Sequence, residues 1–262
     1  MPRINAWFSC GSASAVAWFL ARQLYVERGP VQAFYCNLLA DEHSDNPRFM
    51  ADVEQWVGDK VMILSSPKYK TVEDVWLDQR FIAGFGGASC SRHLKRKVRE
   101  AHALPGDITV MGYTADEQDR ADSFVDSHPD MECLWPLIER GITKEDCYHI
   151  LTAEGIELPM MQRLGFNNNN CIGCCHGGKG YWNKIRIHFP NRFADRARAQ
   201  RSLGIPFRSG GEPFFLDELK PGEGRDVPEP PIECGIMCGQ YSQLVQVSVA
   251  VIPSALDGVN GV

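Results

Sequence analysis

The sequence predicts an α/β fold, a parallel twisted sheet with helices on both of its faces. Between residues 4 and 112, short apolar runs alternate with longer segments in which apolar residues recur at helical spacing. Parallel strands need such crossover helices, so the alternation favours βαβ units. Glycine or proline also stands at the expected ends of several elements, as at Gly29, Pro30, Gly58 and Gly112.

The elements can be placed one by one. Strands are expected at residues 4–8, 31–36, 60–64 and 107–111, and helices at 13–28, 49–58, 71–79 and 94–103, with a loop at 84–87. After Gly112 the alternation ends, and helices are expected at 143–154, 160–164 and 182–200. Thr143, followed three residues later by Asp146, has the pattern of a helix cap.

The composition changes after residue 207. Glycine and proline crowd residues 208–233, which predicts a mobile or extended segment rather than a core element. Residues 245–252 could add an edge strand, and the chain from Asp257 is expected to fray. The sequence therefore divides into a main domain at 1–207, which holds a cysteine cluster, and a C-terminal extension at 208–262, which carries Cys234 and Cys238.

Composition and charge narrow the function classes. With 262 residues, 44% of them hydrophobic, the chain can form one large domain or a domain with a small appendage. A net charge of −6 argues against a surface that is basic throughout, although a local basic patch for nucleic acid remains open. No apolar run reaches the roughly 18–20 residues of a membrane helix, and Met1–Ala6 lacks the pattern of a signal peptide. A cytoplasmic protein without a membrane partner is expected.

The turn after the first expected strand consists mostly of small residues: Ser9, Cys10, Gly11, Ser12, Ala13 and Ser14. Small residues let backbone N–H groups approach a ligand, and the N-terminus of the following helix favours an anion there. Ser12 or Ser14 can cap the helix or donate to a phosphate. Open parallel sheets bind ligands at this position. The turn predicts a phosphate or sulfate site, with an ordinary serine-capped turn as the alternative.

Ten cysteines are many for a chain of the reducing cytosol, where clustered thiols favour metal or redox chemistry over disulfides. Cys171 and Cys174 have the spacing of a pair that presents two sulfurs to one metal centre. The candidates that could complete such a site are Cys90, Cys175, Cys234 and Cys238. Either a 4Fe–4S cluster or a structural zinc fits this set, and free thiols are the alternative. The remaining cysteines lie in or beside apolar segments and are expected to be small buried hydrophobes: Cys10, Cys36, Cys133 and Cys147.

Cys234 follows the glycine- and proline-rich segment and is a candidate nucleophile. A reactive thiolate needs access and a lowered pKa, which a basic, anion-binding pocket would provide. A mobile tail could bring Cys234 to such a pocket and then present the adduct to an external reductant. Ligation of a metal together with Cys238 is the competing role.

Basic residues form three groups that could bind an oxyanion. The densest is the run from Ser91 to Lys97, which contains Arg92 and Lys95. Arg120 follows the fourth expected strand, and the third group comes after the cysteine pair: Lys179, Lys184 and Arg186. Arginine forks match the geometry of phosphate and sulfate. Each residue taken alone fits a solvated surface charge, but the cysteines and the strand end beside these groups favour the binding role.

Together these motifs resemble the phosphoadenosine phosphosulfate (PAPS) and adenylyl-sulfate reductase family of the PP-loop superfamily, over residues 4–240. The turn at Ser9–Ser14 stands in the place of the PP-loop, and Cys90 with Arg92 and Lys95 resembles the family's cysteine, arginine and lysine stretch. Gly112–Arg120 is similar to its substrate-binding turn, and Glu233–Gly235 to the terminal signature that carries its nucleophile. Other motifs match in order: Trp135–Ile138, Thr143–Asp146, Pro159, Leu164–Phe166 and Cys171–Cys174. The stretch from Asn170 to Pro190 looks more like the small members carried by bacteriophages.

The sequence departs from the family at four positions. Ala13 stands where an ATP-cleaving PP-loop has an aspartate, and Cys10 where it has a second glycine, which argues against ATP pyrophosphatase activity. Ser89 replaces one of two adjacent cysteines of cluster-bearing reductases. The fourth ligand must then be Cys238, Cys175 or Cys234. The family's terminal histidine is absent, and Cys238 lies near its place.

The resemblance implies a thiol-dependent reductase that releases sulfite from PAPS or adenylyl sulfate. Cys234 would be the nucleophile, a thioredoxin-like dithiol the reductant, and Cys90, Cys171, Cys174 and Cys238 the ligands of a 4Fe–4S cluster, with zinc as the alternative metal. Ser9–Ser14, Arg92, Lys95, Gly112 and Arg120 would bind the substrate. An ATP-dependent sulfur transferase, with nucleic acid as one acceptor, and a non-catalytic zinc-stabilised module are the other readings. A homodimer is compatible with each.

Overall fold

The computed structural model describes residues 1–84 and 87–225, and its centre is a five-stranded parallel sheet. The strand order is β3 (Met62–Leu64), β2 (Val31–Cys36), β1 (Ile4–Trp7), β6 (Ile108–Val110) and β7 (Glu132–Leu134). The predicted α/β class is thereby confirmed. The order runs outward from β1 to β3 on one side and from β6 to β7 on the other, so the direction of winding reverses between β1 and β6.

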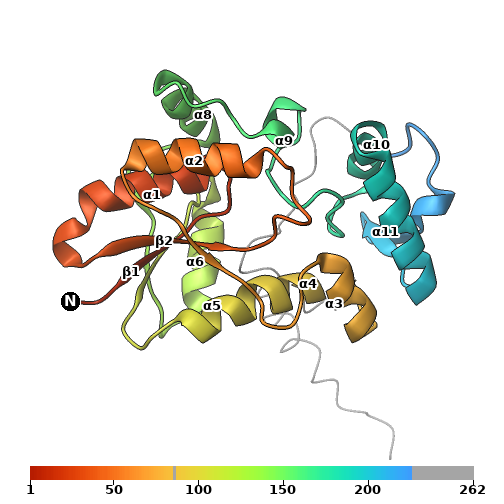
Figure 1. The fold of residues 1–262 in the computed structure, drawn as a ribbon, viewed down its shortest axis with the longest axis horizontal. Coiled ribbons are helices and arrows are strands. Elements are labelled where there is room, and N and C mark those ends of the chain that lie inside the picture. Colours follow the sequence, from red (N-terminus) through yellow and green to blue (C-terminus); the bar gives the residue numbers. More distant parts are fainter. Residues whose placement is uncertain (85–86, 226–262) are drawn as a thin grey trace, which may run out of the picture.

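Helices cover both faces of this sheet, as the sequence predicts (Figure 1). Ile4 and Ala6 of β1 pack with one set of helices: α1 (Ser12–Leu24), α2 (Asn46–Val57), α7 (Pro136–Glu139) and α8 (Lys144–Ala153). Trp7 lies on the opposite face with Val98 of α5 (Lys97–His102), next to α6 (Gln118–Ser127). We call the cluster around Ile4, Ala6 and α1 the sheet core.

The segment between β6 and α7 contains three elements that were not predicted. Its apolar stretch at 131–135 contains β7, and the polar sequence before it forms α6 and the short η3 (Ala115–Glu117). Only Ala121 and Phe124 of α6 are buried, so the segment offers few apolar residues from which a helix could be predicted. Tertiary pairing with β6 decides the state of β7.

The basic helix begins earlier than its spacing predicts. Ser89 starts α4 (Ser89–Ser91), which continues through the π-helical turn η2 (Arg92–Arg96) into α5. The expected loop at 84–87 contributes a short antiparallel pair, β4 (Ala83–Gly84) and β5 (Gly87–Ala88). The predicted helix at 71–79 is α3 (Val72–Gln79). Thr71 and Asp74 form a capping box at its start, in which the side chain of each accepts a hydrogen bond from the backbone N–H of the other.

A second core lies beyond the carboxyl ends of the strands, around α10 (Lys179–His188) and α11 (Pro190–Leu203) (Figure 1). The single helix predicted at 182–200 is therefore two helices, because Pro190 begins a new one. This cluster, the cysteine core, also includes Trp76 of α3 and Met161 of α9 (Met160–Arg163).

The expectation that no core element follows residue 207 is wrong for its first part. Phe207 and Phe214 belong to a hairpin of β8 (Phe207–Ser209) and β9 (Glu212–Phe214), and both side chains are buried in the cysteine core. Leu216 of η4 (Leu216–Glu218) is fully buried there as well. The expected domain boundary falls inside β8. The predicted strand at 245–252 lies outside the described residues. None of the described helices, including the short η1 (Val26–Arg28), is long and apolar enough to span a membrane.

Candidate anion and cysteine site

The turn Ser9–Ser14 lies at the point where the winding of the sheet reverses. It follows β1, and Gly112 follows the neighbouring strand β6. A Cβ atom on Gly112 would stand 2.8 Å from the backbone nitrogen of Ser14, so only glycine permits this approach. Open α/β sheets bind their ligands in the crevice at such a reversal. The structure thus brings two of the predicted binding elements, the turn and Gly112, into contact.

The start of α1 is suited to an anion. Gly11 is the N-cap residue, it provides no side-chain acceptor, and the first turn of the helix contains no acidic residue. The free N–H groups and the helix dipole therefore favour a negatively charged ligand. The alternative interpretation, a serine-capped turn, is not borne out, because no side chain caps the helix. Ser14 Oγ instead accepts from Ser9 N at 3.1 Å and donates to the Gly11 carbonyl at 2.9 Å. Ser12 Oγ donates to Gln162.

Cys10 has a left-handed backbone with φ of 55°, which is uncommon for a residue with a side chain. Its thiol is fully buried in the sheet core, and this burial raises the pKa of the thiol well above its usual value. Cys10 can thus contribute its backbone to the turn but not its thiol. The carbonyl of Cys10 accepts from Asn169 Nδ2 at 2.6 Å.

Asn169 belongs to a buried polar network that the sequence did not reveal. Its Nδ2 also donates to Asn46 Oδ1 at 2.8 Å, and Asn46 Nδ2 donates to Glu42 Oε2 at 2.6 Å. The Tyr35 hydroxyl donates to the same Glu42 oxygen at 2.6 Å. Asn169 precedes Cys171 by two residues, so the network connects the anion turn to the cysteine turn. The only sequence signal was the placement of Asp41 and Glu42 just beyond a strand end.

Four of the cysteines lie together in the cysteine core. Cys90 on α4 and Cys171, Cys174 and Cys175 on one turn are each at most 7% exposed. The protonated Cys175 thiol hydrogen-bonds the side chains of Cys174 and Cys90, and these bonds, together with burial, raise the pKa of Cys175 well above its usual value. The predicted neighbourhood of Cys90 and the Cys171–Cys174 pair is thus present, and Cys175 lies within it.

The cysteine turn is fixed by Tyr181 and Gly173. The Tyr181 hydroxyl accepts from the backbone nitrogens of Gly173 and Cys174, each at 3.0 Å, and donates to the Cys171 carbonyl at 3.1 Å. Gly173 has φ of +80°, and a Cβ atom there would lie 3.0 Å from the Trp182 ring. These contacts hold the turn in its conformation without the help of a metal.

A buried ion pair holds the same turn from the other side. Arg196 is fully buried and donates to Asp41 Oδ1 at 2.5 Å. Asp41 Oδ2 accepts from Val72 N at the start of α3, and the Asp41 carbonyl accepts from Ile172 N, at 2.7 and 2.8 Å. Burial alone would lower the pKa of Arg196, but the carboxylates of Asp41 and Glu73, with Cys171, outweigh it and raise the pKa.

The donor set has the chemistry of a thiolate metal site. Buried, clustered cysteines beside a cationic guanidinium suit an iron–sulfur or zinc centre, since the thiolates then carry a compensated charge. Within residues 1–84 and 87–225, however, no group of three or more histidine, cysteine, aspartate or glutamate residues is arranged to hold a metal ion. The expected fourth ligand, Cys238, and the expected nucleophile, Cys234, which was also an alternative ligand, lie outside the described residues.

The three basic residues of the expected substrate site differ in their surroundings. Lys95 is buried on η2, whereas Arg92 at the start of the same turn is exposed. Arg120 pairs with Glu117 at 2.5 Å and lies over the Tyr113 ring at 4.4 Å. Tyr113 in turn stacks on Trp135 with ring centroids 5.1 Å apart. Arg120 and these rings form a cationic, aromatic wall at the carboxyl ends of β6 and β7, which the sequence motifs did not indicate.

Comparison with known proteins gives only distant similarities. No protein-family model and no curated protein matches the sequence. A PAPS reductase from Candida auris, solved as a phosphate complex, is similar with 11% identity and a TM-score of 0.46, over 65% of this chain and 82% of the other. The U34-tRNA thiolase NcsA from Methanococcus maripaludis, solved with its 4Fe–4S cluster, has 13% identity and a TM-score of 0.44, over 77% and 70%. At TM-scores below 0.5, neither similarity assigns a function to this chain.

Proposed function

We propose that the protein is an enzyme of sulfur chemistry that binds an adenosine-linked anion, and that it reduces PAPS or adenylyl sulfate to sulfite. One observation carries the proposal: an uncapped helix N-terminus at the reversal of the sheet is connected through Asn169 to a buried set of four cysteines. An anion site alone would fit many enzymes. The adjoining thiols restrict the chemistry to metal, redox or sulfur transfer.

The residues divide the work between binding and chemistry. Backbone amides from Ser9 to Ser14 hold the phosphate, and Arg92, Lys95 and Arg120 add positive charge. The thiolate of Cys234 attacks the sulfate sulfur, the S–O bond to the nucleotide breaks, and the adenosine phosphate leaves. An external dithiol then attacks Cys234, releases sulfite and becomes oxidised to a disulfide, which balances the two electrons. A cluster held by Cys90, Cys171, Cys174 and a fourth cysteine, when bound, supplies a charged centre beside the sulfate.

Among the described residues, Cys175 is the candidate for the fourth position of this cluster. It is buried with the other three cysteines and hydrogen-bonds Cys174 and Cys90. This assignment supports the proposal, because Cys234 is then available as the nucleophile.

A sulfite assay tests the reductase directly. Protein purified without oxygen, with its iron and zinc contents measured, is incubated with adenylyl sulfate or PAPS and a dithiol. We expect sulfite at catalytic rates, abolition of turnover by Cys234→Ser with substrate binding retained, and little effect of Cys133→Ser. Turnover by the Cys234→Ser variant, or no sulfite from iron-replete protein, would contradict the proposed reductase mechanism.

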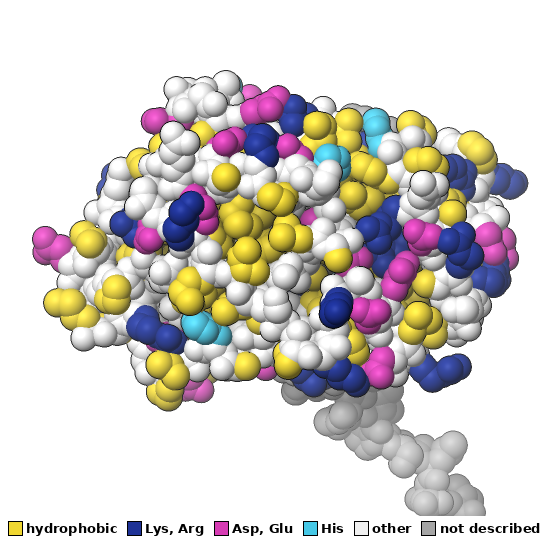
Figure 2. Space-filling model, in the orientation of Figure 1, with side chains coloured by type: hydrophobic (Ala, Val, Ile, Leu, Met, Phe, Trp, Pro, Cys, Tyr) yellow, Lys and Arg dark blue, Asp and Glu magenta, His cyan; other side chains and the backbone are white. Residues whose placement is uncertain are grey.

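ATP-dependent sulfur transfer is the second candidate. Lys and Arg side chains occur over the end of the molecule that contains α10 and α11, with Asp and Glu side chains between them (Figure 2). A nucleic-acid acceptor would bind these basic side chains. Binding of tRNA or DNA with an affinity that falls steeply with salt, together with ATP cleavage, favours this candidate over the reductase. Ala13 in the turn argues against it.

A further inference from the structure

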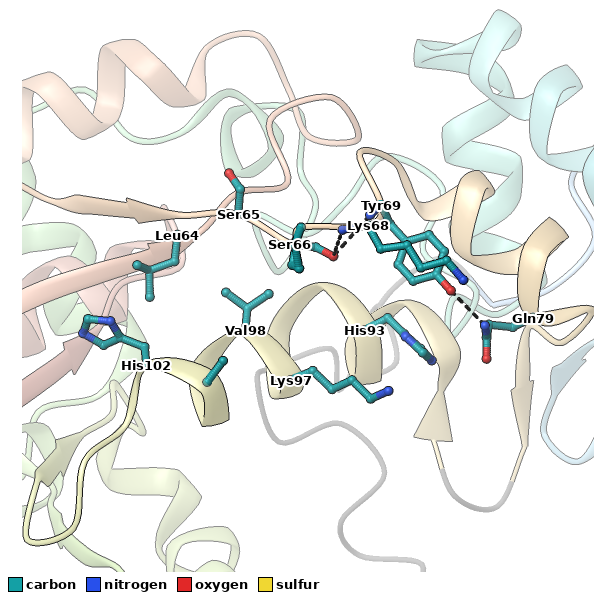
Figure 3. Close-up of a pocket in the computed structure, with 12 residues that line it drawn as sticks. Leu64, Ser65, Ser66, Lys68, Tyr69, Gln79, His93, Lys97, Val98 and His102 are labelled. Atoms are coloured by element: carbon teal, nitrogen blue, oxygen red, sulfur yellow. Dashed lines mark hydrogen bonds between the residues drawn. The ribbon is translucent and has the colours of Figure 1, made fainter.

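A second pocket lies beyond β3, apart from the anion turn. Its volume is about 630 Å³, and it is formed by the segment after β3 and by one side of η2 and α5 (Figure 3). The anion turn follows β1, and β2 lies between β1 and β3, so the two places are about 10 Å apart along the sheet. Pockets of about 300–1,000 Å³ are the usual size of small-molecule sites.

The basic side chains gather at one end of the pocket. Lys68, His93 and Lys97 lie together near Gln79, whereas Leu64 and Val98 lie towards the opposite end, with His102 (Figure 3). His93 and Lys97 are one helical turn apart and face the pocket, while Lys95 between them is buried. The basic run thus has two sides, and the proposed reductase uses only the side with Lys95.

The charged end is positive overall. None of the residues that line this pocket is acidic. The carboxylate of Asp78 pairs with Lys68 at 2.8 Å and accepts from the Tyr69 hydroxyl at 2.6 Å. Among the described residues, Lys97 forms no ion pair. Burial lowers the pKa of His93, and the positive charges of Lys97, Arg92 and Lys68 lower it further.

We propose that this pocket is a second binding site, for a phosphate-bearing ligand of the size of a mononucleotide. Lys97, Lys68 and His93 hold the phosphate, and Leu64 and Val98 contact the uncharged part. Two ligands carry a phosphate on a group of this size: a free mononucleotide and the phosphorylated end of a nucleic-acid strand. The inference does not depend on the reductase, because it rests on different residues and a different pocket.

Titration with uridine 5′-monophosphate, followed through the ring protons of His93, tests the site on the full chain. The His93→Gln variant identifies the signal of His93. The probe contains no adenine, so it lacks the base expected in the proposed substrate site. We expect a saturable shift in the wild-type protein. Lys97→Ala should weaken binding by about fivefold or more, because an exposed cationic contact is lost. Lys70→Ala is the matched control, since Lys70 is exposed on the same segment but does not line the pocket.

Asp78→Asn should change the affinity for the nucleotide in the opposite direction to Lys97→Ala. It removes the negative charge beside Lys68 and keeps an acceptor for Tyr69, so binding should become tighter, whereas a merely structural effect would weaken it. A 5′-phosphorylated oligouridylate that binds more tightly than the mononucleotide, with the same Lys97 dependence, identifies a strand end as the source. Equal affinities identify the free nucleotide. No His93 shift, or equal affinity in wild type and Lys97→Ala, overturns the proposal.

Discussion

The Tyr181 hydroxyl shows how much of the site depends on a single atom. It is bonded to three backbone groups of the cysteine turn, and burial raises the pKa of Tyr181 well above its usual value. The hydroxyl therefore stays protonated and can donate to the Cys171 carbonyl while it accepts from two N–H groups. The sulfurs of Cys171 and Cys174 are oriented by this arrangement and not by their sequence spacing alone.

Tyr181→Phe should destabilise the protein and, under the proposed function, weaken the binding of the metal. The substitution leaves two buried N–H groups without their acceptor, at a cost of about 1–3 kcal/mol in the free energy of unfolding. Denaturant unfolding and the iron or zinc retained after dialysis measure the effect. Tyr148→Phe is the control, because its hydroxyl accepts a single bond from Gln162 at 3.2 Å. Equal stability of the two variants would contradict the role of Tyr181.

Between elements, ion pairs fix helices and strands that the sequence separates widely. Arg196 of α11 bonds Asp41 after β2, and Asp41 also accepts from the first residue of α3. The guanidinium lies 4.9 Å from the Trp76 ring of α3 as well. At the other end of the strands, Arg3 and Asp107 connect the starts of β1 and β6. Both pairs join segments more than one hundred positions apart in sequence.

Arg196→Met should lower the free energy of unfolding by about 3–5 kcal/mol, because the buried Asp41 carboxylate loses its short ion pair and keeps only the longer one with Arg192 at 3.7 Å. Arg198→Met provides the comparison two positions along the same helix. The Arg198 side chain is 73% exposed and pairs with Asp195, so its loss should cost at most about 1 kcal/mol. Urea titrations of both variants measure the difference. A similar, small cost for both would show that the buried pair contributes nothing beyond a surface pair.

Asp107 should give the protein a component of acid sensitivity. Its hydrogen bond with Arg3 is the main cause that lowers the pKa of Asp107 to about 2. The folded state thus binds the proton less readily than the unfolded state. The stabilisation, about 2 kcal/mol, is present above about pH 4 and is lost as the pH falls towards 2. Free energies of unfolding measured across this range should fall less steeply for Asp107→Asn. An unchanged slope would exclude Asp107 as the cause.

In the whole molecule, Asn169 and Asp41 connect the sheet core with the cysteine core. Asn169 bonds the anion turn through Cys10 and lies two residues before Cys171. Asp41 bonds the cysteine turn through Ile172. The loop after β2 and the loop before Cys171 therefore connect the binding of an anion to the environment of the thiols.

Ligand binding should protect the cysteines through Asn169. In metal-free protein, adenylyl sulfate is expected to slow alkylation of Cys174 and Cys175 by at least about threefold. The bound ligand stabilises the folded cysteine turn, in which both thiols are buried. Asn169→Ala should remove most of this protection while the ligand still binds. Mass spectrometry of alkylated peptides gives the rates, and Cys133 serves as the internal control. Full protection in Asn169→Ala would separate the two sites.

The sequence by itself determined where the first strands and their helices lie along the chain, and it indicated the candidate anion turn, because local periodicity and glycine placement specify these elements. It also paired Cys90 with Cys171 and Cys174 through the family resemblance. Only the tertiary structure decided that 131–135 is a strand, that Phe207 and Phe214 enter a core, and that Ser14 binds within its turn instead of capping α1. These outcomes depend on partners distant in sequence, such as β6 for β7. The network of Glu42, Asn46 and Asn169 has the same cause, since buried polar side chains carry no local pattern and acquire their roles only when the loops meet.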